Sequence, residues 1–411
     1  MNLSENCKIL FNTNRVVILN RENGAWMRIS KECYDILEES IRNNESQEEL
    51  LMRLYDDEDR TYFKKILDKL DALGVLDPEH KKWGVNDVSI YLTNRCNLKC
   101  SHCIVDASTI NECDKYNTEE IYRIIDKVSK THPKNITFSG GEVMVRKDFF
   151  DIIEYAKRSF DGEITIMTNG TLINEQNIKK LVKNVNYISI SMDGIDEDSC
   201  SIIRGKGVFS KVMRSISLLH NENFHRISLS MVLTKNNENL INGFFELNKR
   251  LNTKPMLRAL AIEGRAKKNV NSLMKNPNVV SNPVFSDTQE PKDKVGCSCK
   301  AGITEFTIDC NGDIYPCDLF VEKSFKLGSV DEFEDLTLLF NNTQNSCIHP
   351  ILSDYNPENY LACKDCDVNY FCWRCPHDLY SLKDDITAFT ERCEFMKPRL
   401  RKVIWAEEAI S

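Results

Sequence analysis

Three cysteines that lie close together, Cys96, Cys100 and Cys103, constrain this chain more than any other feature of its sequence. They follow a strand-like run that ends at Thr93. Thiolates are the preferred ligands of iron-sulfur clusters, and each iron of a cubane takes one cysteine, so three cysteines leave one iron open to a substrate. A zinc clip and three buried thiols are the alternatives, because short cysteine groups often bind zinc. The spacing therefore indicates a metal centre at the end of a strand.

Strand-like and helical runs alternate between residues 86 and 265. The strand candidates cover residues 88–92, 136–138, 164–167, 187–190, 227–232 and 256–260. A helical run fills each gap, and such a series of β-α units predicts a parallel sheet that curls into an open barrel. In barrels of this kind the functional site lies at the carboxyl ends of the strands. The predicted fold class is thus α/β, with a partial, TIM-like (β/α)6 barrel at its centre.

Polar residues stand at those carboxyl ends. Gly140, Gly141 and Glu142 come directly after the second strand. The glycines let the backbone approach a ligand closely, and the carboxylate can receive an ammonium group. Each position taken alone is compatible with an ordinary turn, since turns favour Gly, Asn and Asp. The next two strands end in the same way, at Thr168, Asn169, Ser191 and Asp193.

These motifs, taken in order, resemble the signature of the radical S-adenosylmethionine (SAM) superfamily. The resemblance rests on the Cys-x3-Cys-x2-Cys spacing, on His102 before the third cysteine, and on Gly-Gly-Glu at the end of the next strand. In that family the amino and carboxylate groups of SAM occupy the open iron of a 4Fe-4S cluster. The resemblance implies that the three cysteines hold this cluster and that the Gly-Gly-Glu motif holds the methionine amino group. The contacts it implies to the ribose and carboxylate of SAM are Thr168, Asn169, Ser191, Asp193 and Arg204.

Residues 1–85 predict a small module with its own fold. Short strands are expected at residues 8–11, 15–19 and 25–29, Ser30 is a candidate N-cap, and three helices follow and end at Gly74. This order resembles the winged helix-turn-helix, PqqD-like peptide recognition element of enzymes that mature ribosomally synthesised peptides. In that family a leader peptide adds as an extra strand to the exposed sheet edge. A DNA-reading wing or a packing appendage is the alternative, although acidic helices would repel phosphate.

Cysteines return in the C-terminal third of the chain. Their array resembles the seven-cysteine SPASM domain of radical SAM enzymes, which carries two auxiliary 4Fe-4S clusters. By that resemblance the ligands of the outer cluster would be Cys363, Cys366, Cys372 and Cys393. Those of the inner cluster would be Cys299, Cys317 and Cys375, with Cys297 as a candidate fourth.

The last close pair of cysteines departs from the family pattern. Cys372 and Cys375 are separated by two residues, whereas the family usually has three. The geometry of the inner cluster, and whether it has an open iron, therefore stay undecided. Zinc is the competing metal for these cysteines, because Cys-x2-Cys pairs suit a tetrahedral zinc site equally well.

Composition restricts the setting in which the chain works. Seventeen cysteines without a secretory signal favour metal ligation in a reducing compartment over a disulfide framework. No apolar run approaches the length of a membrane span, so we expect a cytoplasmic protein without a membrane partner. The net charge of -8 and the lack of a dense Lys and Arg run argue against nucleic acid. A peptide or a small molecule is the expected partner.

The predicted parts are a leader-recognition module (1–85), a radical SAM barrel (86–265), a linker (266–296) and a SPASM domain (297–400). The resemblance implies a maturase that binds the leader of a ribosomally synthesised precursor peptide and installs an oxidative crosslink by means of a 5′-deoxyadenosyl radical. A Cys-to-carbon thioether is the expected bond, and a carbon-carbon or carbon-oxygen crosslink stays open. The implied cofactors are SAM and three 4Fe-4S clusters. The implied electron donor is a protein such as flavodoxin or ferredoxin.

Asp318, next to Cys317, is the candidate general base. It resembles the position of the proton acceptor in anaerobic sulfatase maturases, which oxidise Cys or Ser to formylglycine, and a surface or turn carboxylate is its alternative role. Formylglycine formation is thus the alternative activity, although that family needs no leader-binding module. A non-enzymatic iron-sulfur protein that binds peptides or transfers electrons is the other alternative, but such a protein has no need of an open SAM site.

Overall fold

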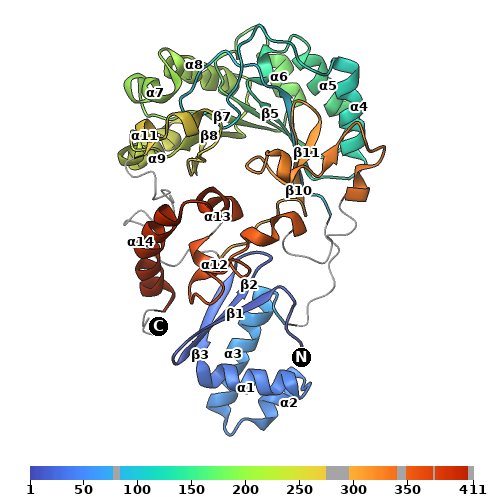
Figure 1. Ribbon diagram of the computed structural model, residues 1–411. Helices are drawn as coiled ribbons and strands as arrows, with labels where there is room; N and C mark the ends of the chain where they lie inside the picture. Colours follow the sequence, from blue (N-terminus) through green and yellow to red (C-terminus); the bar gives the residue numbers. More distant parts are fainter. Residues whose placement is uncertain (77–83, 275–295, 340–348, 374, 406–411) are drawn as a thin grey trace. The chain divides into compact units, whose positions relative to one another are not determined.

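The computed structural model describes residues 1–76, 84–274, 296–339, 349–373 and 375–405 (Figure 1). Within it the chain divides into two compact units. The first unit consists of Met1–Trp83, Gln289–Lys300 and Asn345–Ser411, and the second consists of Gly84–Thr288 and Ala301–Gln344. The N-terminal module therefore belongs to the same folded unit as Cys297, Cys299, Cys363, Cys366, Cys372, Cys375 and Cys393.

A nine-stranded sheet forms the centre of the second unit, in the order β12-β11-β10-β4-β5-β6-β7-β8-β9. Neighbouring strands from β10 to β9 run parallel, whereas β11 and β12 are added antiparallel. The six strands predicted from sequence are all present as β4 to β9. The strands are β4 (Asp87–Thr93), β5 (Asn135–Gly140), β6 (Glu163–Thr168), β7 (Tyr187–Ser191), β8 (Ile227–Val232), β9 (Lys254–Arg258), β10 (Glu305–Ile308), β11 (Asp313–Tyr315) and β12 (Gly328–Ser329).

Amphipathic helices lie along the outside of this sheet (Figure 1). In α4, for example, Ile121, Ile125 and Val128 are buried, and Asn117 and Glu120 form a capping box at the first turn. Because such helices cover the outer face of the sheet, a functional site is expected at the carboxyl ends of its strands. The helices are α4 (Thr118–Ser129), α5 (Phe149–Ser159), α6 (Ile178–Asn184), α7 (Glu197–Arg204), α8 (Val208–Asn221), α9 (Ile241–Leu251), α10 (Arg265–Lys268) and α11 (Val270–Leu273), and the 3-10 turns are η1 (Val143–Val145), η2 (Glu238–Leu240), η5 (Lys323–Phe325) and η6 (Leu336–Leu339).

The sheet extends beyond the six predicted strands. β10 comes from the segment that was expected to belong to the SPASM domain, and it pairs in parallel with β4, with Glu305 opposite Asp87. An unpaired strand edge exposes a row of backbone N–H and C=O groups, so β10 satisfies the free edge of β4. Part of the predicted linker also has regular structure, because α10 and α11 lie within 265–273. The linker positions 275–295 lie outside the described residues.

A three-stranded antiparallel sheet and three helices form the N-terminal part of the first unit. Ser30 caps α1, since its hydroxyl accepts a hydrogen bond from the Cys33 N–H at 3.1 Å. Gly74 ends α3 with a φ of 71°, the left-handed conformation that glycine adopts without strain. The predicted strands, cap and helices are thus present, as β1 (Cys7–Asn12), β2 (Arg15–Asn20), β3 (Trp26–Ser30), α1 (Lys31–Arg42), α2 (Gln47–Arg53) and α3 (Asp57–Leu73).

The cysteine-rich C-terminal segment packs against this N-terminal module within the first unit. Trp26 of β3 meets Phe371 edge to face, with ring centroids 5.1 Å apart. Arg21, which is 1% exposed, donates to the Cys297 carbonyl and, at 2.8 Å, to Asn356 Oδ1. Buried polar and aromatic contacts therefore join the two ends of the chain. The helices of the C-terminal segment are η7 (Pro350–Tyr355), α12 (Asn369–Cys372), α13 (Pro376–Leu382) and α14 (Ile386–Ile404).

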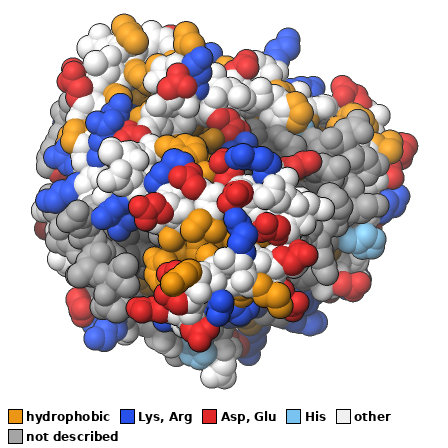
Figure 2. Space-filling view, turned by 90° about the horizontal axis from the view of Figure 1, so that it is seen from below, with side chains coloured by type: hydrophobic (Ala, Val, Ile, Leu, Met, Phe, Trp, Pro, Cys, Tyr) orange, Lys and Arg blue, Asp and Glu red, His pale blue; other side chains and the backbone are white. Residues whose placement is uncertain are grey.

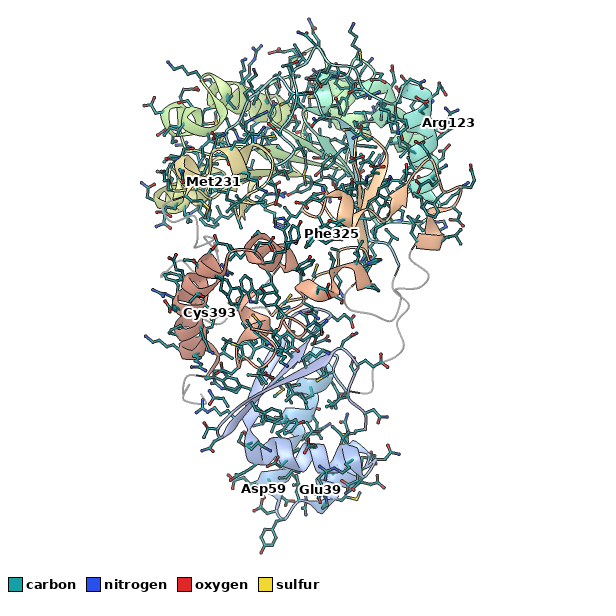
Figure 3. The ribbon with its side chains drawn as sticks, in the orientation of Figure 1. Glu39, Asp59, Arg123, Met231, Phe325 and Cys393 are labelled. Atoms are coloured by element: carbon teal, nitrogen blue, oxygen red, sulfur yellow. The ribbon has the colours of Figure 1, made fainter. Side chains whose placement is uncertain are left out.

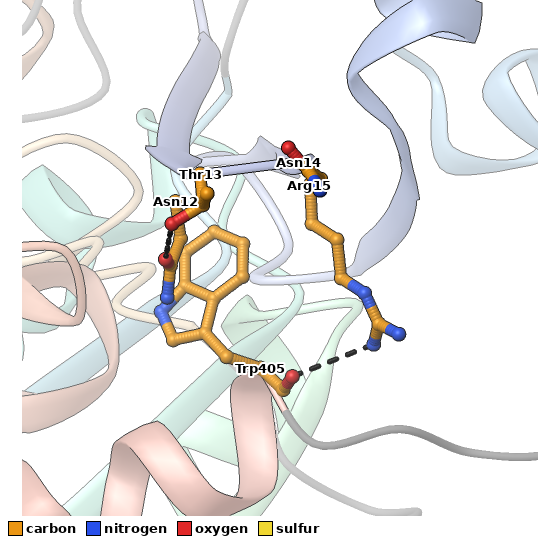
Figure 4. A pocket seen from close by; sticks show the side chains of 5 residues that line it. All are labelled: Asn12, Thr13, Asn14, Arg15 and Trp405. Carbon is orange, nitrogen blue, oxygen red and sulfur yellow. Dashed lines mark hydrogen bonds between the residues drawn. The ribbon is translucent and has the colours of Figure 1, made fainter.

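A small pocket opens at the turn between β1 and β2 (Figure 4). Its lining consists of Asn12, Thr13, Asn14, Arg15 and Trp405, and Arg15 Nη1 donates to the Trp405 carbonyl at 3.4 Å. Its volume of about 180 Å³ is below the several hundred Å³ that ligand pockets usually have. The pocket is therefore too small for a substrate of peptide size.

Charges of both signs are mixed on the surface. On the face seen in Figure 2, Lys and Arg side chains are interspersed with Asp and Glu, and apolar side chains lie between them. The N-terminal module contributes acidic positions such as Glu39 on α1 and Asp59 on α3 (Figure 3). Among the helices that the structure describes, none combines the length and apolarity needed to cross a membrane.

Candidate functional site

The three cysteines of the first motif lie on the loop that follows β4, the cysteine loop (residues 94–104). Cys100 is buried, and Cys96 and Cys103 are partly buried. Burial raises the pKa of the Cys96 thiol to about 11, and the nearby Glu142, Cys100 and Cys103 act in the same direction. Over the described parts of the chain, no three Cys, His, Asp or Glu side chains converge tightly enough to be recognised as a metal site. The three thiols nevertheless lie within electrostatic reach of one another on one loop.

A turn after β9, which no sequence pattern had indicated, holds the cysteine loop. Arg265 Nη1 donates to the Cys100 carbonyl at 3.1 Å, and the Arg265 backbone N–H donates to the Cys103 carbonyl at 2.8 Å. Gly264 has a φ of 53°, and a Cβ atom on it would lie 2.2 Å from the Ile104 carbonyl oxygen. The only signal in the sequence is the Gly-Arg pair after the last barrel strand, and such a pair indicates no particular chemistry.

Gly140 and Gly141 pack directly against the start of the cysteine loop. A Cβ atom on Gly140, whose φ is 120°, would lie 2.3 Å from the Thr93 carbonyl oxygen, and one on Gly141 would lie 2.2 Å from that of Arg95. The Gly141 and Glu142 N–H groups donate to the same two carbonyls, each at 2.8 Å. The glycines are therefore needed for the contact between strand and loop, and their role toward SAM stays a prediction.

Glu142 is fully buried, and its carboxylate ties together the ends of β5 and β6. Its Oε1 accepts from the Thr168 hydroxyl at 2.7 Å and from the Met144 N–H at 3.2 Å, and its Oε2 accepts from the Asn169 N–H at 2.7 Å. Burial raises the pKa of Glu142, and these hydrogen bonds oppose the shift. Glu142 thus fixes the positions of two other candidate SAM contacts.

Asp193 and Arg204, both expected to contact SAM, are paired with each other. The Asp193 Oδ2 atom lies 2.6 Å from Arg204 Nε and 2.6 Å from His102 Nε2, and Oδ1 accepts from the Val232 N–H at 2.7 Å. Burial opposes ionisation of Asp193, but the Arg204 and His102 charges lower its pKa to about 2. Arg204 Nη1 also approaches Cys100 Sγ, at 3.8 Å. This buried network therefore links β7 and β8 to the cysteine loop.

The remaining candidate SAM contacts also stand at strand ends. Thr168 is the last residue of β6, and Ser191, which is half-buried, is the last residue of β7. Asn169 Nδ2 donates to Asn97 Oδ1 at 2.8 Å and lies 3.9 Å from Cys96 Sγ. The structure thus gives all of these side chains places at the carboxyl ends of the sheet, and their contacts with SAM stay predictions.

Asp318 is half-buried against the barrel sheet. Its Oδ1 accepts from the Thr307 hydroxyl of β10 at 2.6 Å, and its carboxylate is hydrogen-bonded to the Tyr91 side chain of β4. Burial raises the pKa of Tyr91 well above its usual value, the Asp318 and Cys317 charges add to this rise, and Arg258 at the end of β9 opposes it. Tyr91 and Arg258 were not singled out from the sequence, because their strands meet only when the sheet curls.

The four cysteines expected to bind the outer cluster lie together in the first unit. Cys363 and Cys372 are buried, and Cys366 and Cys393 are partly buried, Cys393 being on α14 (Figure 3). Burial raises the pKa of the Cys363 thiol to about 11 and that of Cys372 to about 12. Cys366 and Cys393 add to the rise at Cys363, and Cys363, Cys366 and Cys393 add to it at Cys372, so these thiols lie within electrostatic reach of one another.

The cysteines expected to bind the inner cluster are divided between the two units. Cys297, Cys299 and Cys375 belong to the first unit, and Cys317 belongs to the second. Burial raises the pKa of the Cys317 thiol to about 12, while hydrogen bonds from the backbone N–H groups that follow it oppose the rise. The assignment of this inner set stays a prediction.

The donor chemistry of both thiol groups fits iron-sulfur clusters. Soft thiolate ligands select iron-sulfur clusters or zinc, whereas hard ions prefer oxygen. A structural zinc site needs four N, S or O ligands, and three cysteines supply only three of them. The three-thiol group therefore suits a cluster with one open iron, and the four-thiol group suits a fully ligated one.

Comparison with known families gives two matches. Residues 90–247 match the radical SAM superfamily, and residues 297–367 match the iron-sulfur cluster-binding domain called SPASM. The chain thus has a segment similar to radical SAM enzymes followed by one similar to SPASM domains, which supports this part of the sequence-based prediction. Cys372, Cys375 and Cys393 lie beyond the SPASM match. The two matches together support an enzyme that acts through radical chemistry.

Among curated proteins, the Fe-coproporphyrin III synthase of Methanosarcina barkeri is 34% identical over 157 residues, which cover 38% of this chain and 39% of that protein. The mycofactocin maturase MftC of Mycolicibacterium smegmatis is 27% identical over 260 residues, which cover 58% of this chain and 66% of that protein. The match thus spans less than half of the first relative and just under two thirds of the second.

Two solved structures resemble this one. The SuiB protein of Streptococcus suis bound to the precursor peptide SuiA has a TM-score of 0.50 at 17% identity, over 93% of this chain and 97% of that one. The protein anSMEcpe with bound AdoMet and the Kp18Cys peptide has a TM-score of 0.50 at 19% identity, over 77% of this chain and 99% of that one. At these identities the similarity shows a shared fold.

Proposed function

We propose that the protein is a radical SAM maturase that binds the leader of a ribosomally synthesised precursor peptide and installs an oxidative crosslink in it. The observation that carries this proposal is the gathering of three kinds of group at the carboxyl ends of one sheet: the cysteine loop, the buried Glu142 and Asp193 networks, and Asp318. The names of the similar proteins support it, since MftC is a maturase and SuiB was solved with a precursor peptide.

The cysteine loop and its surroundings form the proposed SAM site. When bound, the clusters supply the electron that splits SAM into methionine and a 5′-deoxyadenosyl radical, and they accept the electron left on the product. Glu142 uses three of the roughly four acceptor positions of a carboxylate, so its Oε2 can accept one further hydrogen bond, from the SAM ammonium group. Arg204 adds a cation beside Cys100 and would hold the SAM carboxylate.

Asp318 is the proposed general base. Thioether formation removes one hydrogen atom from a peptide carbon and one proton from the cysteine thiol, so the site needs a proton acceptor as well as a radical. The hydrogen bonds from Thr307 and Tyr91 orient the Asp318 carboxylate. These two neighbours come from β10 and β4, so they belong to the rigid sheet and hold the base at a defined place.

The N-terminal module is the proposed leader-binding element. Its sheet has two edge strands, β1 and β3, and an extended peptide can add to such an edge by main-chain hydrogen bonds. The order of three strands followed by three helices is that of the PqqD-like element that the sequence resembles. The leader would then be held on the same unit as the outer-cluster cysteines.

Anaerobic reconstitution with iron and sulfide tests the proposal. We expect about twelve irons per chain, 5′-deoxyadenosine formed from SAM under reduction, and a precursor peptide lighter by two hydrogens. Cys100→Ala should abolish SAM cleavage, whereas Cys113→Ala, at an exposed cysteine, should retain it. SAM cleavage that persists in the Cys100→Ala variant, or bound zinc without any cleavage, would overturn the proposal.

The nature of the product separates the crosslinking enzymes from the alternative activity. A thioether consumes the peptide thiol, so alkylation of the product with iodoacetamide should fail; a carbon-carbon or carbon-oxygen crosslink leaves that thiol reactive. Formylglycine, the alternative that the position of Asp318 suggests, is an aldehyde and reacts with a hydrazide probe. An aldehyde in the product would therefore replace the crosslinking maturase by an enzyme similar to sulfatase maturases.

A further inference from the structure

A buried indole and a buried cation lie beside the cysteines expected to bind the outer cluster. Trp373 directly follows Cys372, is 1% exposed, and donates from its Nε1 to Cys363 Sγ at 3.2 Å. Arg392 directly precedes Cys393 and is fully buried. Its guanidinium carbon lies 4.5 Å from the centre of the Trp373 ring, and its Nη2 donates to the Cys372 carbonyl at 3.0 Å. One indole N–H and one cation thus face the same set of thiols.

Packing holds this pair in place. The Trp373 ring also stacks on Phe389 of α14, at 5.7 Å between centroids and 20° between planes. Because the ring contacts both Phe389 and Arg392, it cannot turn its N–H away from Cys363 without breaking two aromatic contacts. The Arg392 guanidinium also binds the Cys372 carbonyl, at 3.0 Å, so the cation lies beside the cysteines as well as beside the indole.

Such surroundings have a known physical effect on an iron-sulfur cluster. Reduction adds one negative charge, and both an N–H donor to a ligand sulfur and a nearby cation stabilise that added charge. The effect is large where water is excluded, because a low dielectric strengthens both interactions. Trp373 and Arg392 are almost free of solvent contact, so both conditions are met.

We propose that Trp373 and Arg392 are positioning residues that raise the reduction potential of the outer auxiliary cluster and thereby prepare it to accept an electron. The inference rests on the proposed function, since it takes Cys363, Cys366, Cys372 and Cys393 as the ligands of that cluster. It goes beyond that function, because it names the side chains that set the reduction potential of the outer cluster.

The test is a redox titration of the reconstituted full-length protein, followed by electron paramagnetic resonance. Trp373→Phe keeps an aromatic ring but removes the N–H donor, so the midpoint potential of one cluster should shift to a more negative value while the iron content stays that of wild type. Phe395→Leu is the matched control, because it changes another aromatic ring of α14, one that is 39% exposed, and keeps the Trp373 N–H group. Its midpoint potentials should stay close to those of wild type.

Arg392→Gln is an independent variant in case Trp373→Phe loses iron. It removes the cation and keeps a polar side chain, and the same cluster should again shift to a more negative potential. Full iron content with unchanged potentials in both variants would overturn this inference and leave the proposed function standing.

The ligand assignment is tested separately with Cys363→Ser: wild-type iron content in that variant would mean that these cysteines hold no cluster, and the proposed function would then lose its outer site.

Discussion

Asp193 joins a set of buried polar groups beside the cysteine loop. It is fully buried, and its two oxygens serve Arg204, His102 and the Val232 N–H. The Asn237 side chain adds a further bond, from its Nδ2 to the Asp193 carbonyl at 3.1 Å. A buried charge network of this kind is costly to break on one side, because the remaining partner is left without a counter-charge.

Asp193→Asn should therefore destabilise the barrel strongly. Arg204 would stay buried without its partner, and the loss should be about 3–5 kcal/mol in the free energy of unfolding. Urea unfolding of the cluster-free protein, followed by circular dichroism, measures this quantity. Asp198→Asn, an exposed position on α7, is the control and should change the value by no more than about 0.5 kcal/mol. Similar losses in both variants would contradict a central role for Asp193.

Glu142→Gln should reduce SAM cleavage more than it reduces folding. In the amide, an NH2 group replaces one of the two carboxylate oxygens. One oxygen now accepts from the Thr168 hydroxyl and the Met144 N–H, and the other accepts from the Asn169 N–H, so in either case a donor would face another donor. Loss of a hydrogen bond to a charged group costs about 1.5–3 kcal/mol, which corresponds to roughly a 10- to 150-fold slower reaction. The rate of 5′-deoxyadenosine formation measures the effect. Glu163→Gln, at an exposed carboxylate, should leave the rate unchanged, and a wild-type rate in Glu142→Gln would refute the role of Glu142.

At the scale of elements, the turn between β9 and α10 decides how closely two loops approach. Arg265 binds two carbonyls of the cysteine loop, and Gly264 permits the contact because it has no Cβ atom. Glycines allow the same close approach at the end of β5, where Gly140 and Gly141 contact the carbonyls of Thr93 and Arg95. Both ends of the cysteine loop are therefore held by backbone contacts that only glycine allows.

Gly264→Ala should lower the occupancy of the first cluster. The new Cβ atom would sit 2.2 Å from the Ile104 carbonyl oxygen and 2.8 Å from that of Cys103, so the turn and the loop must move apart. Gly207→Ala is the matched control: its φ of 78° is also left-handed, but nothing lies within 4 Å of its Cβ position, so it bears only a strain of about 1 kcal/mol. Iron content and SAM cleavage after reconstitution are the readouts, and equal effects of the two substitutions would argue against the close contact.

At the scale of the whole molecule, the N-terminal module supports the C-terminal cysteines. Arg21 is buried between them and donates to the Cys297 carbonyl, and the Gly296 N–H donates to the Gly24 carbonyl at 2.8 Å. The Trp26 ring packs on Phe371, one residue before Cys372. A module that bound only the leader would not need such contacts, so its removal should affect more than peptide binding.

Deletion of residues 1–85 should impair peptide modification more than SAM cleavage. The residues of the proposed SAM site all belong to the other unit, so SAM cleavage and about four irons should remain. The auxiliary clusters should lose iron, since the contacts around Cys297 and Phe371 are removed with the module. Iron counting, 5′-deoxyadenosine and peptide mass are measured on the same preparation. Equal loss of SAM cleavage and peptide modification would instead indicate general misfolding or a wrong assignment of the leader site.

Much of the fold and the general location of the candidate site follow from local sequence patterns. The period of apolar residues predicted β1 to β9 and their helices, Ser30 and Gly74 marked helix ends, and the cysteine spacing marked the loop after β4. These features depend on residues within one short segment, where backbone geometry relates spacing to structure directly. The polar strand ends could be placed together because parallel strands of one barrel share an edge.

Local patterns therefore predict the class of element at each segment and the thiol chemistry of the cysteines. The partners follow from the three-dimensional packing alone: Asp193 with Arg204, Tyr91 with Asp318, Trp373 with Cys363, and β10 beside β4. These partners are far apart along the chain or depend on which face of a short helix is buried. Their distances follow from how the sheet curls and how the core packs, which no local pattern encodes.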